Sequence, residues 1–295
     1  MNGALGIHLA VSEGRVSPAI TSATAVPVAT MMIGRAPEEV AALMPRLFNL
    51  CGVAQGLAAR LALGLPHEGG GDLGREILRD HLAKLCLHWP HLLGLASAPL
   101  PEGWSAGGAP LVTAIWGGAR PTHAADWLAS GRGVAPVLAA LAASFAPGEA
   151  VAQVPALTAP LSVTAQENSP AGRSADDPLM VQIARDFGRG PLWRAFGRLV
   201  DLARMAEAPP QAELIAAGTA LVPAARGTYA LSAHQKDGRV TAFARVTPTD
   251  HLTAPGGALE QSLARLPAAK LSLARLVVDI LDPCVPVEIA EVSHA

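Results

Sequence analysis

The chain has 295 residues, of which 51% are hydrophobic and only 16% are charged, and its formal net charge is −2. This composition excludes a disordered chain, which needs low hydrophobicity and abundant charge, and the near-neutral balance speaks against nucleic acid as the main partner. The cysteines Cys51, Cys86 and Cys284 are too few and too far apart for a disulfide framework. The sequence shows no signal peptide and no apolar stretch of membrane-spanning length, so we expect a cytoplasmic protein without a membrane span.

Hydrophobic patterns divide the chain into a series of predicted elements. In chain order, they are a hairpin over residues 5–24, a helix that starts at Pro37 and is interrupted early by Pro45, helices over 51–63, 72–89, 134–145, 177–187 and 192–206, a hairpin over 228–246, a helix over 259–266, and a buried strand or helix over 273–281. Pro90 is expected to close the 72–89 helix. The Asp237-Gly238 step suits a type I′ turn. Residues 97–175 are rich in Ala, Pro, Gly and Ser, which predicts a loop-rich middle.

Two local motifs match functional patterns in their letters but not in their context. Residues 103–107 match the G-x-S-x-G nucleophile elbow, but the prolines on both sides of Ser105 leave no strand or helix to build it. Residues 69–74 match G-x-G-x-x-G, but no strand precedes them as a dinucleotide site requires. We therefore predict a loop at each place, with Asp72 as the N-cap of the next helix, and a Ser105 hydrolase is disfavoured.

Histidines and arginines offer two further alternatives. His81, Cys86, His88 and His91 could supply a zinc or iron set, but Cys86 lies off the helical face that His81 and His88 share. An amphipathic helix with partly exposed histidines is favoured instead. The segment 185–204 interleaves arginine with aromatic residues, as some nucleic-acid-binding segments do. A solvated helix face or a docking surface for an acidic partner fits the slightly acidic chain better.

The other two cysteines lie in distinctive local sequences, N-L-C-G-V-A over residues 49–54 and D-P-C-V-P-V over 282–287. This pair resembles the two cysteine motifs of nickel-iron hydrogenase large subunits, R-x-C-G-x-C and D-P-C-x-x-C. Further segments resemble that family's E-G-H-L hairpin, P-R-G stretch and V-x-P-[ST] segment, in family order: Gly6 to Leu9 with Gly14 to Val16, Ala225 to Gly227 followed by Asp237 to Val240, and Val246 to Thr249.

The resemblance covers residues 1–65 and 225–290. It implies an α+β fold that is mainly helical, a trimmed version of the large subunit with β-hairpins near both ends, in a single domain over 1–295. Ala54 and Val287 stand where the family has its nickel-iron bridging cysteines, and Ala58 and Ala290 stand at the motif histidines. Because a nickel centre needs several soft thiolates, we expect no nickel, no hydrogen turnover and no catalytic residue.

The family has a short, degenerate branch, the HupK/HoxV type of hydrogenase expression/formation protein, which this sequence resembles in size and in its lost ligands. The resemblance implies a scaffold or chaperone that carries iron with cyanide and carbonyl ligands to the large-subunit precursor, alongside Hyp-type maturation proteins. It also implies that Arg226, Pro248 and Thr249 contact the cyanides, which suits their guanidinium and hydroxyl donors. Cys51 and Cys284 are expected to hold the iron reversibly, with the Cys51 thiolate favoured by a helix dipole. The alternative is a metal-free adaptor of the hydrogenase assembly complex.

Overall fold

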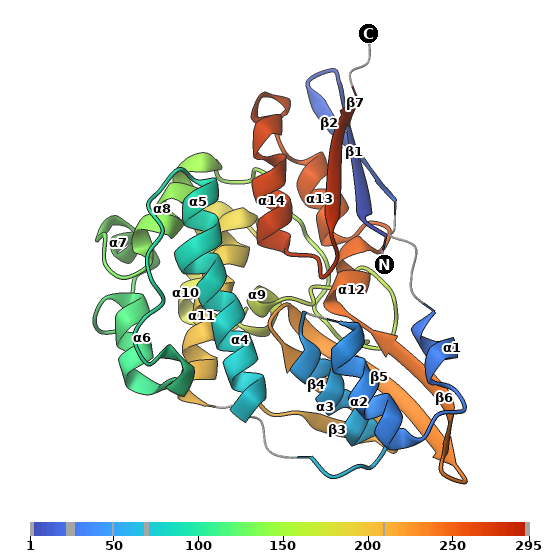
Figure 1. Ribbon diagram of the computed structural model, residues 1–295. Coiled ribbons are helices and arrows are strands. Elements are labelled where there is room, and N and C mark those ends of the chain that lie inside the picture. Colours follow the sequence, from blue (N-terminus) through green and yellow to red (C-terminus); the bar gives the residue numbers. More distant parts are fainter. Residues whose placement is uncertain (1–2, 22–26, 49, 68–70, 209, 293–295) are drawn as a thin grey trace.

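The computed structural model describes residues 3–21, 27–48, 50–67, 71–208 and 210–292, and it shows a body of helices beside two β-sheets (Figure 1). The first elements are β1 (Leu5–Ser12), β2 (Arg15–Thr21), α1 (Val28–Met32), α2 (Pro37–Leu47), α3 (Gly52–Ala62) and α4 (Gly71–Ala83). The middle elements are a π-helical turn (Lys84–His88), α5 (Trp89–Leu92), a 3₁₀ turn (Trp104–Ala106), α6 (Gly108–Trp116), α7 (Ala124–Ala129), α8 (Ala135–Ser144), α9 (Pro170–Arg173), α10 (Pro178–Phe187) and α11 (Pro191–Glu207). The last elements are β3 (Glu213–Ala216), β4 (Thr219–Ala224), β5 (Gly227–Lys236), β6 (Arg239–Val246), α12 (Pro248–Thr253), α13 (Ala258–Ala264), a 3₁₀ turn (Ala268–Leu273), α14 (Ala274–Leu281) and β7 (Val287–Val292).

The first sheet joins the two ends of the described chain. Its strand order is β2-β1-β7, and β1 and β2 form the predicted antiparallel hairpin. The turn between them places Glu13 and Gly14 at φ 50° and 73°, the positive values that a type I′ turn needs. The sequence does not indicate β7, which runs parallel to β1 with Leu5 opposite Val287. This pairing holds the segment that follows Cys284 against the start of β1.

The second sheet is an antiparallel meander in the order β3-β4-β5-β6. Its β5–β6 hairpin confirms the predicted turn, with Asp237 and Gly238 at φ 50° and 71°. Helix α3 packs across β4 and β5, and α1 packs against β6 (Figure 1). The apolar residues between these layers form a separate cluster that includes Cys51, Ala54 and Tyr229.

The helical body surrounds α11, which contacts α4, α6, α8, α9, α10 and α14. Trp116, Trp127 and Phe196 meet there with ring centroids 5.0 to 6.1 Å apart. The prediction of a loop-rich middle is therefore wrong in part, because α6 and α7 as well as the expected α8 lie in it. Their helices are short and separated by Gly and Pro, which hides their periodicity, but buried tryptophans anchor them to the core.

Helix α4 contributes to both apolar clusters, with Leu73 and Ile77 on the sheet side and Leu82 on the helical side. The expected stop at Pro90 is wrong: the helix passes through a π-helical turn and continues as α5. A wider turn of this kind accommodates a residue that cannot donate an N–H. Similarly, α2 continues past Pro45. The segment over 273–281, predicted as a buried strand or a helix, forms the helix α14. No described helix is long and apolar enough to cross a membrane.

Candidate functional site

The structure brings Cys51 and Cys284 face to face, although they come from opposite ends of the chain. Cys51 occupies the N-cap position of α3 at φ 55°, a left-handed conformation that non-glycine residues rarely adopt. Cys284 follows α14, whose C-cap residue Asp282 has the same φ of 55°. The Cys51 thiol hydrogen-bonds to Cys284. Strained backbone on both sides of one thiol pair is typical of functional sites.

The two thiols differ in their preferred protonation state. The hydrogen bond to Cys284, together with burial, raises the pKa of Cys51 well above its usual value. Accepting that bond lowers the pKa of Cys284, and the charge of Arg226 and the Thr249 hydroxyl lower it further. Cys284 is thus the more readily ionised thiol of the pair, and Cys51 holds its proton more tightly. The expectation of a favoured thiolate at Cys51 is wrong, because the hydrogen bond to Cys284 and burial raise its pKa despite the dipole of α3.

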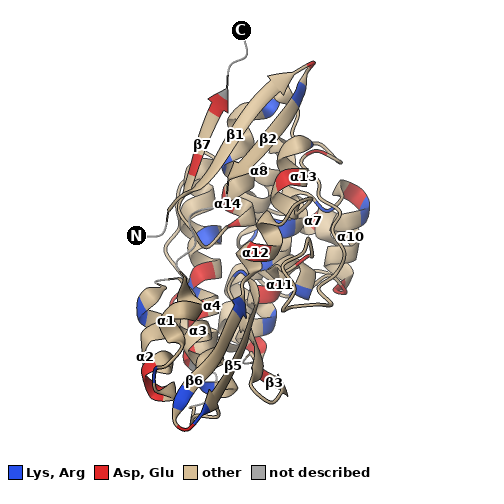
Figure 2. Ribbon diagram, turned by 90° about the vertical axis from the view of Figure 1, so that its right-hand side faces the viewer, with Lys and Arg blue, Asp and Glu red and all other residues tan. Residues whose placement is uncertain are grey.

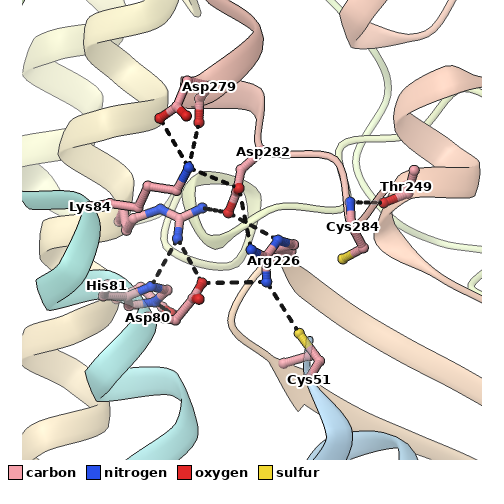
Figure 3. A network of polar contacts seen from close by, with 12 residues as sticks. Cys51, Asp80, His81, Lys84, Arg226, Thr249, Asp279, Asp282 and Cys284 are labelled. Carbon is pink, nitrogen blue, oxygen red and sulfur yellow. Dashed lines mark hydrogen bonds and ion pairs between the residues drawn. The ribbon is translucent and has the colours of Figure 1, made fainter. Parts of the chain in front are cut away.

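Arg226 and Thr249 adjoin this thiol pair (Figure 3), and Pro248 directly precedes Thr249 at the start of α12. Arg226 Nη1 lies 3.6 Å from Cys51 Sγ, and Thr249 Oγ1 accepts a hydrogen bond from the Cys284 backbone N–H at 2.8 Å. All three residues also line a cavity of about 30 Å³, which has room for about two water-sized molecules. The five residues singled out in the sequence therefore form one site.

Asp282 anchors a buried network of charges behind the cysteines. Its carboxylate lies 3.0 Å from Lys84 Nζ, 2.9 Å from Arg198 Nη2 and 3.0 Å from Arg226 Nε. Burial alone would raise the pKa of Asp282, but these three cations hold it well below its usual range. Asp80 adds a second carboxylate, 3.3 Å from Arg198 and 3.5 Å from Arg226 (Figure 3). Paired in this way, the charges fix the orientation of the Arg226 guanidinium.

His81 extends the network away from the thiols. Its Nε2 lies 2.8 Å from Asp201 Oδ2, and Arg198 Nη1 lies 3.4 Å from its Nδ1. Burial lowers the pKa of His81, so the ring is neutral, donating from Nε2 and accepting at Nδ1. The expectation of a partly exposed histidine is wrong for His81, which is fully buried, and confirmed for His88 and His91.

The other sequence alternatives do not form sites. Within the residues that the structure describes, no group of three or more His, Cys, Asp or Glu side chains is placed to hold a metal ion. Cys86 is buried in apolar surroundings, which raises its pKa to about 11. Ser105 is exposed in a 3₁₀ turn; the described residues 93–103 that lead into it form no strand, although α6 does follow. Asp72 is not an N-cap but lies in the first turn of α4, and residues 68–70 lie outside the described residues.

The arginine-rich segment is a solvated face only in part, because Arg185 and Arg189 are exposed and the arginines further along α11 are not. Arg194 and Arg198 are buried in ion pairs, with Arg194 Nη2 2.6 Å from Glu167 Oε2. Acidic and basic residues are interspersed over the elements (Figure 2).

Of the other polar residues near the motifs, His251 is buried against the carbonyl oxygens of Thr164 and Pro160, whereas His8 is exposed on β1.

Comparisons with known proteins identify the relatives of this chain. No protein-family model matches it. The chain is 61% identical to the hydrogenase expression/formation protein HupK of Rhodobacter capsulatus, over the whole of both chains. It is 26% identical to HupK of Azotobacter vinelandii, over 91% of this chain and 92% of that protein. HoxV of Cupriavidus necator is 36% identical over 80 residues, which are 24% of this chain and 20% of that one.

Solved structures with the same fold are nickel-iron-selenium hydrogenases. The enzyme from Desulfovibrio vulgaris Hildenborough matches 93% of this chain and 94% of its own, with a TM-score of 0.55 and 13% identity. The enzyme from Desulfomicrobium baculatum matches 93% and 95%, with a TM-score of 0.53 and 13% identity. At this identity the likeness establishes a fold of the hydrogenase large-subunit type and nothing more. The full-length identity to the R. capsulatus protein goes further: the chain belongs to the HupK family of hydrogenase expression/formation proteins.

Proposed function

We propose that this chain carries iron with cyanide and carbonyl ligands on Cys51 and Cys284 and delivers this cargo to the precursor of a hydrogenase large subunit. Membership in a family of hydrogenase expression/formation proteins supports the broader role in hydrogenase maturation. The iron cargo is inferred from one observation: the thiols of Cys51 and Cys284 lie next to Arg226 and Thr249. The large-subunit precursor and Hyp-type maturation proteins are the proposed partners.

The thiol pair suits a cargo that must be released again. Thiolates are soft ligands that bind iron well, and Cys284 is the more readily ionised thiol of the pair, since its pKa is lowered. Cys51 must lose its proton before it can bind a metal. Since the pKa of Cys51 is raised, this proton competes with the cargo and weakens its retention. A carrier needs such reversibility, whereas an enzyme that keeps its metal does not.

The cavity that Arg226, Pro248 and Thr249 line suits diatomic ligands. Arg226 Nε is buried and has no aligned hydrogen-bond acceptor among the described residues, although Asp282 Oδ2 lies 3.0 Å away. The Thr249 hydroxyl is a second donor, and both line the cavity together with the apolar ring of Pro248. Donors of this kind fit the nitrogen of an anionic cyanide, and the cavity volume is that of about two small molecules.

The same arrangement of residues makes the proposed carrier non-catalytic. Ala54 is completely buried in α3 and Val287 lies in β7, so neither position offers a third or fourth ligand. Two thiols are too few for the soft ligand set of a nickel centre. The proposed cargo is therefore iron without nickel, and hydrogen turnover is not part of the proposed function.

Infrared spectroscopy tests the proposal. Protein purified without oxygen from cells that also make the maturation proteins is expected to show bands of metal-bound cyanide and carbonyl. The Cys51→Ser/Cys284→Ser double variant should lose these bands and fail to support hydrogenase formation, whereas the control Cys86→Ser should keep both. Absence of the bands in maturation-competent wild-type protein would overturn the cargo. Full maturation by the double variant would favour the metal-free adaptor instead.

A further inference from the structure

Helix α4 and the π-helical turn after it carry three charged side chains at a spacing of four residues: Glu76, Asp80 and Lys84. Four residues are slightly more than one helical turn, so these side chains follow one face. Each contacts a different segment of the site. Glu76 reaches the first cysteine motif, Asp80 reaches Arg226, and Lys84 reaches Asp282 in the second motif.

Glu76 caps the helix that begins after Cys51. Its Oε2 accepts the Val53 N–H at 2.9 Å, and its Oε1 accepts the Ala54 N–H at 3.2 Å. Cys51, the N-cap residue of α3, makes no capping hydrogen bond with its side chain, and sulfur is a weak acceptor. A carboxylate from another helix therefore takes the place of the missing cap, and its negative charge suits the positive end of α3.

Lys84 holds the second motif in a similar way. Its Nζ lies 3.0 Å from Asp279 Oδ1, 3.2 Å from the Asp279 carbonyl oxygen and 3.0 Å from Asp282 Oδ1 (Figure 3). These contacts fasten the end of α14 two residues before Cys284. The helix becomes π-helical at this residue, over Lys84–His88, and π-helical turns are frequent at functional sites.

Asp80 lies between Glu76 and Lys84 on this helical face and contacts the arginine between the two cysteine motifs. It lies 3.5 Å from Arg226 Nη1, the nitrogen that is 3.6 Å from Cys51 Sγ, and 3.3 Å from Arg198 Nη1. Both cysteine motifs and the guanidinium between them thus depend on one helix. Hydrophobic contacts on both sides of α4 fix that helix in the interior.

We propose that Glu76 and Lys84 are positioning residues, and that α4 is a rigid spacer that holds Cys51 and Cys284 at the separation needed to bind one metal ion. This role of α4 concerns the same site as the proposed function, and the identity of the metal bound in the cell rests on that proposal. A site set in this way is preorganised before any metal arrives, which reduces the entropy lost on binding. The spacer can be tested without the iron cargo.

Cadmium binding to the purified chain provides the test, measured by thiolate-to-cadmium charge-transfer absorption, with Cys51→Ser as the background. Glu76→Ala should lower the Cd²⁺ affinity about fivefold, the factor that corresponds to the ~1 kcal/mol of a lost helix cap. Lys84→Met should lower it about tenfold or more, because it removes a buried cation from two carboxylates. Arg75→Ala, an exposed change on the same helix, should leave the affinity unchanged.

Cys86 reports whether a loss comes from positioning or from general loosening. A bifunctional bimane reagent should cross-link Cys51 to Cys284 in the wild type and in Arg75→Ala, and several times less in Glu76→Ala and Lys84→Met. Labelling of the buried Cys86 should stay low in all four. Unchanged Cd²⁺ affinity and cross-linking in both site variants would overturn the spacer, as would a parallel rise in Cys86 labelling.

If Glu76→Ala does not fold, Glu76→Gln tests whether Glu76 acts by capping α3. Its amide oxygen can still accept one N–H of α3, so it should retain more than half of the wild-type Cd²⁺ affinity. A loss in Glu76→Gln as large as that in Lys84→Met would contradict a role through the cap. Missing infrared bands in wild-type protein that still shows the expected Cd²⁺ pattern would remove the iron cargo and leave the spacer in place.

Discussion

The charged network around Asp282 and the aromatic cluster around Trp127 are both buried, but different forces hold them together. Asp282 joins three cations from three separate segments: the π-helical turn, α11 and the turn between β4 and β5. Trp127 packs edge to face against Trp116 and Phe196, with ring centroids 5.0 and 5.8 Å away. Aromatic packing contributes directly to stability, whereas a buried ion network contributes little net stability because desolvating its charges is costly.

The difference indicates separate tasks for the two regions. The aromatic cluster holds α6 and α7 to α11 and lies apart from the thiols. The charged network orients Arg226 and the Cys284 segment, and apolar residues of similar volume could not do this. Substitutions in the first region should therefore change stability alone, and substitutions in the second should change stability and the thiol pair together.

Asp282→Ala is expected to have the largest effect. It leaves Lys84, Arg198 and Arg226 without their shared acceptor, and breaking a buried charge network in this way costs about 3–5 kcal/mol. Urea unfolding measures the loss, and the Cd²⁺ affinity of the folded fraction should fall as well. Asp186→Ala, which breaks an exposed ion pair, is the control and should change neither quantity. A loss below about 1 kcal/mol would contradict the central role of Asp282.

Trp127→Phe should have a smaller effect that is confined to stability. The indole Nε1 donates a buried hydrogen bond to the Trp116 carbonyl oxygen at 2.9 Å, and phenylalanine leaves this acceptor unpaired. The expected loss is about 2 kcal/mol, from the unpaired group and the smaller ring. The Cd²⁺ affinity should stay at the wild-type value. A fall in affinity would show that the two regions are coupled and do not have separate tasks.

The sequence predicts the elements whose signals are local. Both hairpin turns, Glu13-Gly14 and Asp237-Gly238, follow from residues that adopt positive φ, and α10 and α11 follow from their periodicity. The strand β7 escapes prediction because it is short and pairs with the other end of the chain. The helices α6 and α7 escape prediction because tertiary burial, rather than local pattern, stabilises them.

The residues of the candidate site also fall into those that local sequence motifs predict and those that only long-range contacts identify. Resemblance to family motifs identifies Cys51, Cys284, Arg226, Pro248 and Thr249, and the structure places them together. The charged network is not predicted because its members pair with residues far away in the sequence, so that buried arginines on α11 resemble a solvated face. One signal is present in the sequence: the spacing of four residues from Glu76 to Lys84. The apolar periodicity of the same helix obscures it.

Acidification should weaken the charged region by a smaller amount than either substitution. Burial lowers the pKa of His81 in the folded chain, so the unfolded chain binds more protons once the pH falls below the ordinary histidine pKa of about 6.5. Stability contributed by the neutral ring is thus present above about pH 6.5 and is lost as the pH falls toward the lower, folded-state pKa.

The free energy of unfolding in urea, measured at several values between pH 8 and pH 5, tests this expectation. His81→Gln can still donate to Asp201 and accept from Arg198 but does not titrate, so its stability should depend less on pH over this interval than that of the wild type. Trp127→Phe should keep the full wild-type pH dependence around a lower stability, because it leaves His81 in place. Equal slopes for wild type and His81→Gln would mean that the ring is not held neutral by burial. His81 would then be a cation in the folded chain, and the network around Asp282 would contain one more positive charge than described above.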